Sequence, residues 1–367
     1  MRTLLVDLGR DYRGGQDQAL QLVKGLKGQG HTPELIAIRG SLLVQRAQRA
    51  GISVHPVDKR WRIFAAAFVI RQLLSGRNIE IVHANEPHAL TAAWLARAHH
   101  RVPLVAARRV IFPLSKSALA QRRYRAAAKI VAVSECVSSA LVHSGIEPGK
   151  IAVIPDGVPL ENSVSQADRE RARQTFGIEP DVLVIGSVGA LTPDKGQEIL
   201  IRAFARIRLR FPDCQLLLPG DGPCRAKLAA VVQELDLDGA VHFPGFVEDV
   251  GRVYAAIDLF AFLAQAEALG TSLLIAMSYG LPIVAAARGG IPEVVEHEKN
   301  GLLLKDSTPE AVASAVERLL EDRKAAAHLG SAAKETIHSR FSREIMVNQT
   351  LKLYEQLLVA RASAYGG

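Results

Sequence analysis

The sequence predicts an α/β protein built from two Rossmann-like domains, each a parallel sheet with helices on both faces. Short apolar segments of strand length alternate with longer segments of helical spacing along the chain, as expected of repeated βαβ units. This alternation breaks once, at residues 155–159, and then starts again. A length of 367 residues also suits two domains of ordinary size.

The first half is predicted to alternate between strands and helices. The expected strands are residues 3–8, 34–38, 51–54, 80–84, 104–107, 129–133 and 150–154, and the expected helices are 17–29, 41–50, 62–74, 89–99 and 134–144. Ser134 is the expected N-cap of the last helix, because its hydroxyl can accept a hydrogen bond from the first turn. The polar segment from Pro155 to Arg173 is predicted to be the interdomain linker.

The second half repeats the pattern. The expected strands are residues 182–188, 215–219, 241–243, 259–262 and 283–287, and the expected helices are 196–210, 224–235, 250–256, 271–277, 309–320, 323–329 and 342–361. Asp221 is expected to cap the helix at 224–235. Nothing matches G-x-G-x-x-G followed by a downstream acid, so the chain disfavours a dinucleotide site.

Composition narrows the class of protein. The chain is 49% hydrophobic and 22% charged, which is typical of a globular protein. Its three cysteines have neither paired nor metal-ligand spacing and are interpreted as reduced thiols. No run approaches eighteen uncharged apolar residues. We therefore expect a soluble or peripheral protein.

Charge is distributed unevenly. Residues 1–160 hold 23 Lys and Arg against 10 Asp and Glu, a net charge of +13, whereas the remainder carries −5. The first half is therefore expected to meet an anionic partner. Nucleic acid is disfavoured because aromatic residues are only 5% and no binding motif is present. The basic and aromatic stretches at Lys59–Phe64 and Lys116–Lys129 suit either an interfacial membrane anchor or a solvated helix face.

The most informative segment is residues 258–304. Glu267 precedes Gly270-Thr271-Ser272, a helical run follows, and an apolar strand then leads to Gly289-Gly290. A helix that starts on Gly-Thr-Ser presents free N–H groups and the positive end of its dipole to an anion such as phosphate. Glu267 can accept hydrogen bonds from hydroxyls. Phosphate and polyol together indicate a nucleotide sugar.

Two further loops follow strands, where open α/β sheets bind ligands. Gly14-Gly15 follows the first strand, and Lys195-Gly196 follows the strand at 182–188. Glycines in such loops let the backbone approach a diphosphate.

Residues 258–304 resemble the donor-site signature of retaining family 4 glycosyltransferases, similar to bacterial lipopolysaccharide-type members. The resemblance extends from Gly14-Gly15 to the last helix. It implies the GT-B fold, with two Rossmann-like domains facing across a cleft and a C-terminal helix that crosses back to the first domain. The implied domains are 1–160 on the acceptor side, 161–341 on the donor side, and the returning helix within 342–367.

The resemblance also implies roles for individual residues. Lys195 neutralises the departing diphosphate, Glu267 binds sugar hydroxyls, and Arg109 contacts the acceptor or diphosphate; these three form the predicted catalytic set. The predicted donor-binding residues are Gly14, Gly15, Gly189, Lys195, Gly220, Phe246, Val247, Glu267, Leu269, Gly270, Thr271 and Ser272. The predicted acceptor-side residues are His83, Glu86 and Arg108. For Phe246, packing in the core is an equal alternative.

Two positions depart from the family pattern. Ala190 stands where an Arg is usual, and Ile275 stands where a second Glu usually binds the ribose diol. Unpaired ribose hydroxyls cost about 1–3 kcal/mol per group. A shifted donor pose, reduced activity and an altered sequence are the competing explanations.

The function implied is retaining transfer of a hexosyl or heptosyl group from a nucleotide sugar to a glycan or lipid-linked acceptor, in cell-envelope polysaccharide or lipopolysaccharide synthesis. No cofactor or metal is expected. The expected location is cytoplasmic, at the inner face of a bacterial cell membrane, with an anionic membrane surface as a further partner. The alternatives are a non-catalytic GT-B scaffold that binds a glycan or a partner protein, and a GT-B nucleotide-sugar epimerase.

Overall fold

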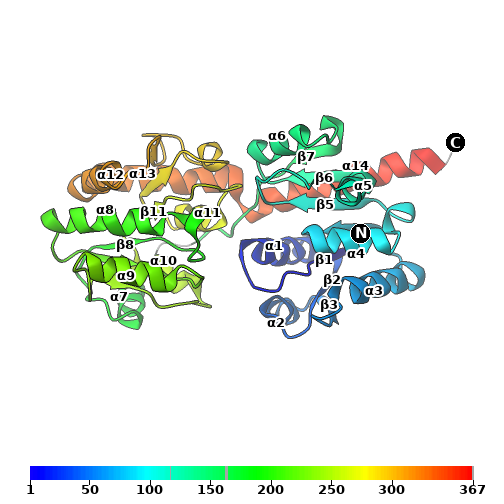
Figure 1. The fold of residues 1–367 in the computed structure, drawn as a ribbon. Helices are drawn as coiled ribbons and strands as arrows, with labels where there is room; N and C mark the ends of the chain where they lie inside the picture. Colours follow the sequence, from blue (N-terminus) through cyan, green and yellow to red (C-terminus); the bar gives the residue numbers. More distant parts are fainter. Residues whose placement is uncertain (116, 162–163, 366–367) are drawn as a thin grey trace. The chain divides into compact units, whose positions relative to one another are not determined.

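The computed structural model describes residues 1–115, 117–161 and 164–365. The chain forms two compact units, one of Met1–Gly157 with Phe341–Gly367 and one of Val158–Arg340 (Figure 1). The first boundary lies three residues before position 160, where the sequence placed it, and the second lies one residue before position 341. Each unit is an α/β domain with its own sheet.

The first unit contains a seven-stranded sheet in the order β3-β2-β1-β4-β5-β6-β7. Its strands are β1 (Arg2–Val6), β2 (Thr32–Ile38), β3 (Ser53–Val57), β4 (Ile81–Ala84), β5 (Leu104–Arg108), β6 (Lys129–Ala132) and β7 (Ile151–Val153). Every strand pair is parallel. The chain runs outward through β2 and β3, then returns to β4 beside β1 and continues the other way. β1 and β4 therefore flank the switch point, where open sheets bind ligands beyond their carboxyl ends.

Helices connect these strands and cover the sheet. They are α1 (Gly14–Gly28), α2 (Leu42–Arg49), α3 (Arg62–Gly76), α4 (Pro87–Leu95), α5 (Ala118–Ala126), α6 (Glu135–His143) and α14 (Arg343–Tyr365), with short helices η1 (Ala98–His100) and η2 (Pro148–Lys150). The last helix packs against α1. Gly25 permits this approach, because a Cβ there would lie 2.3 Å from Cγ2 of Val347.

The structure of the first unit differs from the sequence-based expectations at three places. Gly14 and Gly15 form the first turn of α1 instead of the loop before it. The strand expected at 51–54 is displaced to Ser53–Val57. α5 was not predicted, because it is rich in Ala and Arg and shows no apolar period; Ser117 caps it. Lys116 lies outside the described residues. The predicted cap at Ser134 is confirmed, since its hydroxyl accepts a hydrogen bond from the Val137 N–H.

The second unit contains a six-stranded parallel sheet in the order β10-β9-β8-β11-β12-β13. Its strands are β8 (Val184–Gly186), β9 (Gln215–Leu217), β10 (Val241–His242), β11 (Leu259–Phe262), β12 (Ile283–Ala286) and β13 (Leu302–Leu304). Its helices are α7 (Gln166–Thr175), η3 (Pro193–Lys195), α8 (Gln197–Arg210), α9 (Arg225–Glu234), α10 (Val250–Ala256), α11 (Thr271–Ser278), η4 (Ile291–Glu293), α12 (Pro309–Glu321), α13 (Arg323–Thr336) and the π-helix η5 (Ile337–Phe341). The switch point lies between β8 and β11.

Two predictions for the second unit are wrong. The linker was expected to run to Arg173, but α7 begins within that segment, at Gln166, and packs on α10. Its anchor is ionic: Arg169 and Arg173 donate to opposite oxygens of Asp258, at 2.6 Å each. Asp221 does not cap α9; its carboxylate accepts from the Gly222 N–H, and the N-cap position is Cys224.

No helix in the described part of the chain combines the length and the apolar character needed to cross a membrane.

Candidate functional site

The second unit brings Lys195 and Glu267 together at the carboxyl edge of its sheet. Lys195 ends η3 in the loop after β8, and Glu267 lies in the loop after β11, so the pair sits on the two sides of the switch point. The Lys195 Nζ donates to Glu267 Oε2 at 2.7 Å. Both side chains are partly buried, with 25% and 17% of their surface exposed.

Glycines hold these two loops against their neighbours. Gly196, with φ of +73°, lies so close to β11 that a Cβ would meet the Leu263 carbonyl oxygen at 2.3 Å. Gly289, with φ of +57°, would place a Cβ 2.0 Å from the Glu267 carbonyl oxygen, and the next N–H, of Gly290, donates to that oxygen at 2.9 Å. The loop after β12 therefore packs against the backbone of Glu267 and fixes its position.

Two further glycines, Gly220 and Gly222, let the loop after β9 pack closely on the loop that leads to Lys195. Gly220, after β9, has φ of +129°, and a Cβ there would lie 1.9 Å from the Gly189 carbonyl oxygen. Gly222 would clash with the Leu191 carbonyl oxygen at 2.4 Å. Gly189 itself faces open space, since no atom of the described residues lies within 4 Å of the position that a Cβ would occupy there. The backbone here is packed on one side and open on the other.

The helix α11 begins next to Glu267. Gly270 is its N-cap with φ of +98°, and no side chain of the described residues caps this end. Thr271 and Ser272 are partly exposed, whereas Leu269 is buried. The first N–H groups of α11 and its positive dipole end thus lie beside a Lys and a hydroxyl-accepting carboxylate, an arrangement suited to a phosphate linked to a polyol.

The two departures noted in the sequence are visible here. Ala190 offers only its backbone, and its carbonyl oxygen accepts from the Gln197 Nε2 at 3.0 Å. Ile275 is partly exposed on α11. Phe246, after β10, is 59% exposed, so the alternative of a core residue does not hold; Val247 beside it is partly buried.

The first unit has a different arrangement at its carboxyl edge, a buried polar network. Asn85, directly after β4, donates through Nδ2 to Asp7 Oδ2 at 2.6 Å and to the Gly15 carbonyl oxygen at 2.9 Å. Its Oδ1 accepts from Arg109 Nη1 at 2.7 Å. The Arg109 Nε donates to Asp156 Oδ1 at 2.8 Å. One chain of contacts therefore joins the ends of β1, β4 and β5 to the segment after β7.

Burial makes this network sensitive to protonation. Asp7 is 1% exposed, and burial raises the pKa of its carboxyl above the ordinary value, although hydrogen bonds from Asn85, Gly9 and Gln16 act in the opposite direction. The Gln16 Nε2 lies 3.1 Å from Asp7 Oδ1, which ties the carboxylate to the first turn of α1. Arg109 is held with 15% of its side chain exposed.

The predicted acceptor-side residues are placed differently from one another. His83 is in the interior, where its Nδ1 lies 2.6 Å from the Tyr354 hydroxyl of α14. Glu86 is the N-cap of α4 and accepts from the Ala89 and His88 N–H groups. Arg108 turns inward and donates to the Phe112 carbonyl oxygen and the Tyr124 hydroxyl. Of the two arginines, Arg109 is the one that joins the network at the edge.

Sequence reasoning missed Asp7, Asn85 and Asp156 as members of this edge. Asp7 and Asn85 each follow a strand of the structure by one residue, and that position was the available signal.

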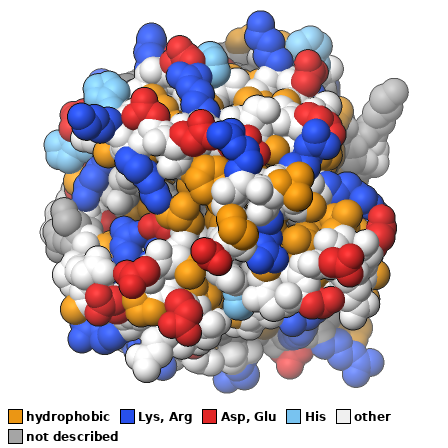
Figure 2. Space-filling model, turned by 90° about the vertical axis from the view of Figure 1, so that its left-hand side faces the viewer, with side chains coloured by type: hydrophobic (Ala, Val, Ile, Leu, Met, Phe, Trp, Pro, Cys, Tyr) orange, Lys and Arg blue, Asp and Glu red, His pale blue; other side chains and the backbone are white. Residues whose placement is uncertain are grey.

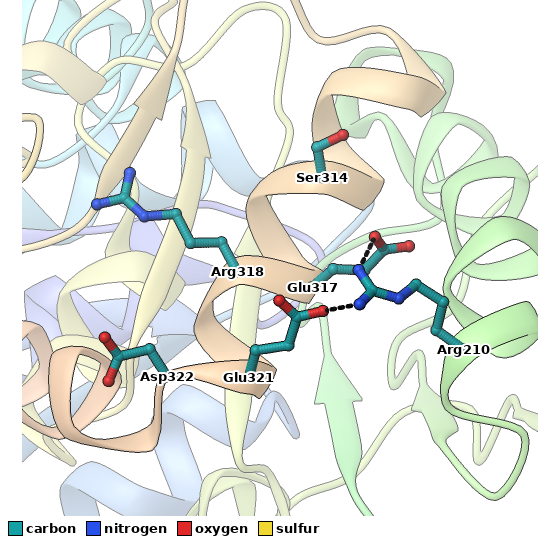
Figure 3. A pocket seen from close by; sticks show the side chains of 6 residues that line it. All are labelled: Arg210, Ser314, Glu317, Arg318, Glu321 and Asp322. Atoms are coloured by element: carbon teal, nitrogen blue, oxygen red, sulfur yellow. Dashed lines mark hydrogen bonds and ion pairs between the residues drawn. The ribbon is translucent and has the colours of Figure 1, made fainter.

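A hollow of about 560 Å³ also lies on the second unit, lined by Arg210, Ser314, Glu317, Arg318, Glu321 and Asp322 (Figure 3). Arg210 ends α8 just before β9 begins, so this hollow is at the amino edge of the sheet. Its charges are paired, with Arg210 bound to Glu317 at 3.4 Å and to Glu321 at 2.5 Å. We assign the site to the carboxyl edge, where the glycine loops and the α11 terminus converge, and not to this hollow.

Two family models match the chain. Residues 12–162 match the model described as Glycosyltransferase Family 4, and residues 168–336 match the model described as Glycosyl transferases group 1.

The relatives are also glycosyl-transferring enzymes. A D-inositol 3-phosphate glycosyltransferase of Corynebacterium urealyticum is 30% identical over 91% of this chain and 78% of that enzyme. An N-acetyl-alpha-D-glucosaminyl L-malate synthase of Bacillus anthracis is 28% identical over 62% of this chain, which spans 60% of that enzyme's length.

Solved structures share the fold. The Anabaena Alr3699/HepE structure in complex with UDP and glucose superposes with a TM-score of 0.84 at 26% identity, over 97% of this chain and 100% of that one. The lipopolysaccharide outer core galactosyltransferase WaaB, at 16% identity and a TM-score of 0.67 over 97% of this chain and 100% of that one, shows the fold alone.

Proposed function

This chain belongs to the family 4 glycosyltransferases and has the GT-B fold, and on that premise we propose that it transfers a sugar from a nucleotide sugar to an anionic or lipid-linked glycan with retention of the anomeric configuration. The observation that carries the proposal is the Lys195–Glu267 pair, at 2.7 Å, beside the N-terminus of α11.

Lys195 and the first N–H groups of α11 would bind the diphosphate of the donor. Negative charge grows on this group as the bond between the anomeric carbon and the phosphate oxygen breaks, so fixed positive charge there stabilises the transition state more than the ground state. Glu267 balances the Lys195 charge before the donor binds and then accepts hydrogen bonds from sugar hydroxyls. The acceptor hydroxyl attacks from the face that the diphosphate leaves, and it transfers its proton to the departing phosphate.

We propose a UDP-sugar as the donor, with a hexosyl group transferred. The support is the HepE relative, whose structures hold UDP with glucose, and UDP-glucose. Gly14 and Gly15 remain proposed diphosphate contacts, because the first turn of a helix offers N–H groups without partners inside the helix. Phe246 is a proposed contact of the base, because an exposed aromatic ring at the strand ends offers a stacking surface.

The acceptor is proposed to contact the carboxyl edge of the first unit. Arg109 is the residue held there by Asn85 and Asp156, and a guanidinium binds phosphate or carboxylate groups through paired hydrogen bonds. The net charge of +13 over residues 1–160 favours an anionic acceptor. Synthesis of cell-envelope polysaccharide or lipopolysaccharide at the inner face of the membrane fits such an acceptor.

The test is to follow UDP release and sugar transfer from UDP-glucose, UDP-galactose and UDP-N-acetylglucosamine, with and without a lipid-linked glycan fraction. Transfer that requires the glycan fraction, with the donor's α configuration kept in the product by NMR, is the expected result. Conversion of donor to an isomeric UDP-sugar without any acceptor would point to an epimerase. No binding of any nucleotide would point to a scaffold and overturn the proposal.

A further inference from the structure

Helix α3 carries three large aromatic side chains on a solvent-facing surface. Trp61 at its N-cap is 61% exposed, and Phe64 and Phe68 are each 64% exposed. The opposite face of α3 is buried through Ala66, Ile70 and Leu73. The helix thus has a complete core-facing stripe, and the aromatic residues are additional to it. Exposed aromatic clusters of this kind mark interaction surfaces.

The aromatic side chains are organised as a group. The rings of Trp61 and Phe64 lie 6.5 Å apart, and the Arg60 guanidinium lies over the Trp61 ring at 5.8 Å. Spacing of i, i+3 and i+7 places the three residues along one side of the helix.

The surroundings are strongly basic. Residues 59–134 contain 14 Lys and Arg, of which Arg108 and Arg109 are held at the carboxyl edge, and their acidic residues are only Glu80 and Glu86. This segment therefore accounts for +12 of the +13 net charge of residues 1–160. Glu86 is occupied as the N-cap of α4, and Glu80 accepts from the Arg2 N–H at 2.6 Å.

The three helices of this segment, α3, α4 and α5, pack side by side. α3 packs on α4, and α4 packs on α5 (Figure 1). Exposed apolar residues continue onto the two neighbouring helices as Leu95, 40% exposed, and Leu119, 52% exposed. Arg122 and Arg125 of α5 are also exposed, and Arg122 follows Leu119 by three residues, on the same side of the helix. We call this surface, made by the exposed side chains of α3, α4 and α5, the α3–α5 face.

We propose that the α3–α5 face docks on an anionic lipid bilayer, with Trp61, Phe64 and Phe68 entering the interfacial region and the surrounding Lys and Arg residues contacting lipid phosphates. Trp and Phe favour the headgroup level of a bilayer, and each basic side chain near an anionic leaflet adds attraction.

Charge favours a bilayer over a second copy of this chain. A symmetric dimer through this face would bring the same basic surface against itself, and like charges across an interface oppose association. An anionic bilayer supplies the opposite charge everywhere the face meets it. The side of the second unit drawn in Figure 2 is different in kind, since it mixes Lys and Arg with Asp and Glu.

Docking by this face has a consequence for the reaction, and that consequence rests on the proposed function. Trp61 begins α3 shortly after β3 ends, so the aromatic residues lie toward the carboxyl edge of the sheet, the edge that also holds Arg109. A bilayer against the face would place this edge near headgroups, where a lipid-linked acceptor is located.

The test measures binding to vesicles, independently of transfer. The protein is sedimented with vesicles of phosphatidylcholine alone or with one third phosphatidylglycerol. The variant W61S/F64S/F68S removes the three exposed rings, and L209S is the matched control, because Leu209 of α8 is 85% exposed on the second unit. K59Q/R60Q tests the charge, with K324Q as its control on an exposed position of α13.

We expect binding to the anionic vesicles only, weakened about tenfold or more in the triple variant and also weakened as salt is raised from about 50 to about 500 mM. L209S and K324Q should bind like the wild type. In a W94F background the Trp61 emission should shift to the blue on binding. Circular dichroism and UDP binding should be unchanged in every variant.

Equal binding of the triple variant and the wild type, or no binding to anionic vesicles, overturns the docking proposal. A wild-type dimer that becomes monomeric in the triple variant would assign the face to self-association and also overturn it. If UDP still binds in those cases, the proposed function stands, so the two failures are distinguishable.

Discussion

The two units have the same kind of sheet and the same kind of switch point, but they build their carboxyl edges by different means. In the second unit, four glycines allow neighbouring loops to contact one another, and the Lys195–Glu267 pair lies beside the N-terminus of α11. In the first unit, a chain of buried side chains, Asp7, Asn85, Arg109 and Asp156, joins the strand ends. A backbone-lined edge suits a ligand part common to many substrates, such as a diphosphate. In the proposed function, the side-chain network of the first unit holds Arg109 for contact with the acceptor.

The largest expected effect tests the glycine-built edge. Gly220→Ala should destabilise the second unit by about 3 kcal/mol or more, because Gly220 has a positive φ and a Cβ would meet the Gly189 carbonyl oxygen at 1.9 Å. Gly189→Ala is the matched control and should change stability by less than about 0.5 kcal/mol, because its methyl would point into open space. Thermal unfolding followed by circular dichroism measures both. Equal stability of the two variants would contradict the close packing of these loops.

This contrast also explains what the sequence could predict. The glycine loops could be predicted because each follows a strand, and the resemblance to family 4 glycosyltransferases implied the roles of Lys195 and Glu267. The network of the first unit joins residues 7, 85, 109 and 156 across the fold, so no local pattern reveals it. α7 escaped prediction for a related reason, since its anchor is the ion pair of Arg169 and Arg173 with Asp258 and not an apolar stripe.

The next effect tests the side-chain network. Asn85→Leu should destabilise the first unit by about 2–3 kcal/mol, because it leaves buried Asp7 and Arg109 without their shared partner. Urea unfolding followed by tryptophan fluorescence reports this unit alone, since both tryptophans, Trp61 and Trp94, belong to it. Asn348→Leu, at an exposed position of α14, is the control. UDP binding should survive in Asn85→Leu. A variant that keeps full stability but no longer binds UDP would contradict the division of roles between the two units.

A smaller effect concerns the buried contact between His83 of β4 and Tyr354 of α14. Burial lowers the pKa of His83 to about 3, and the charge of Arg109 adds to this. The folded state therefore binds fewer protons than the unfolded state below pH 6.5, so stability is complete above that pH and falls toward pH 3. Between pH 7 and pH 5 the first unit should lose about 2 kcal/mol through His83.

The measurement compares the pH slopes of urea unfolding in wild type, His83→Gln and His143→Gln, where His143 is exposed. Only His83→Gln should have a flatter slope. Asp7, whose pKa is raised by burial, changes stability in the opposite direction, but it is common to all three proteins and cancels in the comparison. Identical slopes would mean that the pKa of His83 is not lowered in the folded protein.

The smallest effect sharpens the account of Ile275. Replacing it with Glu places a carboxylate at the partly exposed position on α11 where the family usually binds the ribose diol. Ile275→Glu should therefore tighten UDP binding about fivefold to tenfold, equivalent to about 1 kcal/mol. Ile275→Leu should leave the affinity unchanged. Weaker binding in Ile275→Glu would show that the ribose lies elsewhere.

The central claim is that Lys195, Glu267 and the start of α11 form a nucleotide-sugar site, and calorimetry tests it most directly. UDP, GDP and ADP are titrated into the wild type, Lys195→Ala and the exposed control Lys324→Ala. We predict that the wild type and the control bind UDP with the same affinity. Lys195→Ala should bind UDP about 10- to 100-fold more weakly, because a hydrogen bond to a charged group is lost. Binding of no nucleotide by the wild type, or UDP binding that is indifferent to Lys195, would contradict the claim.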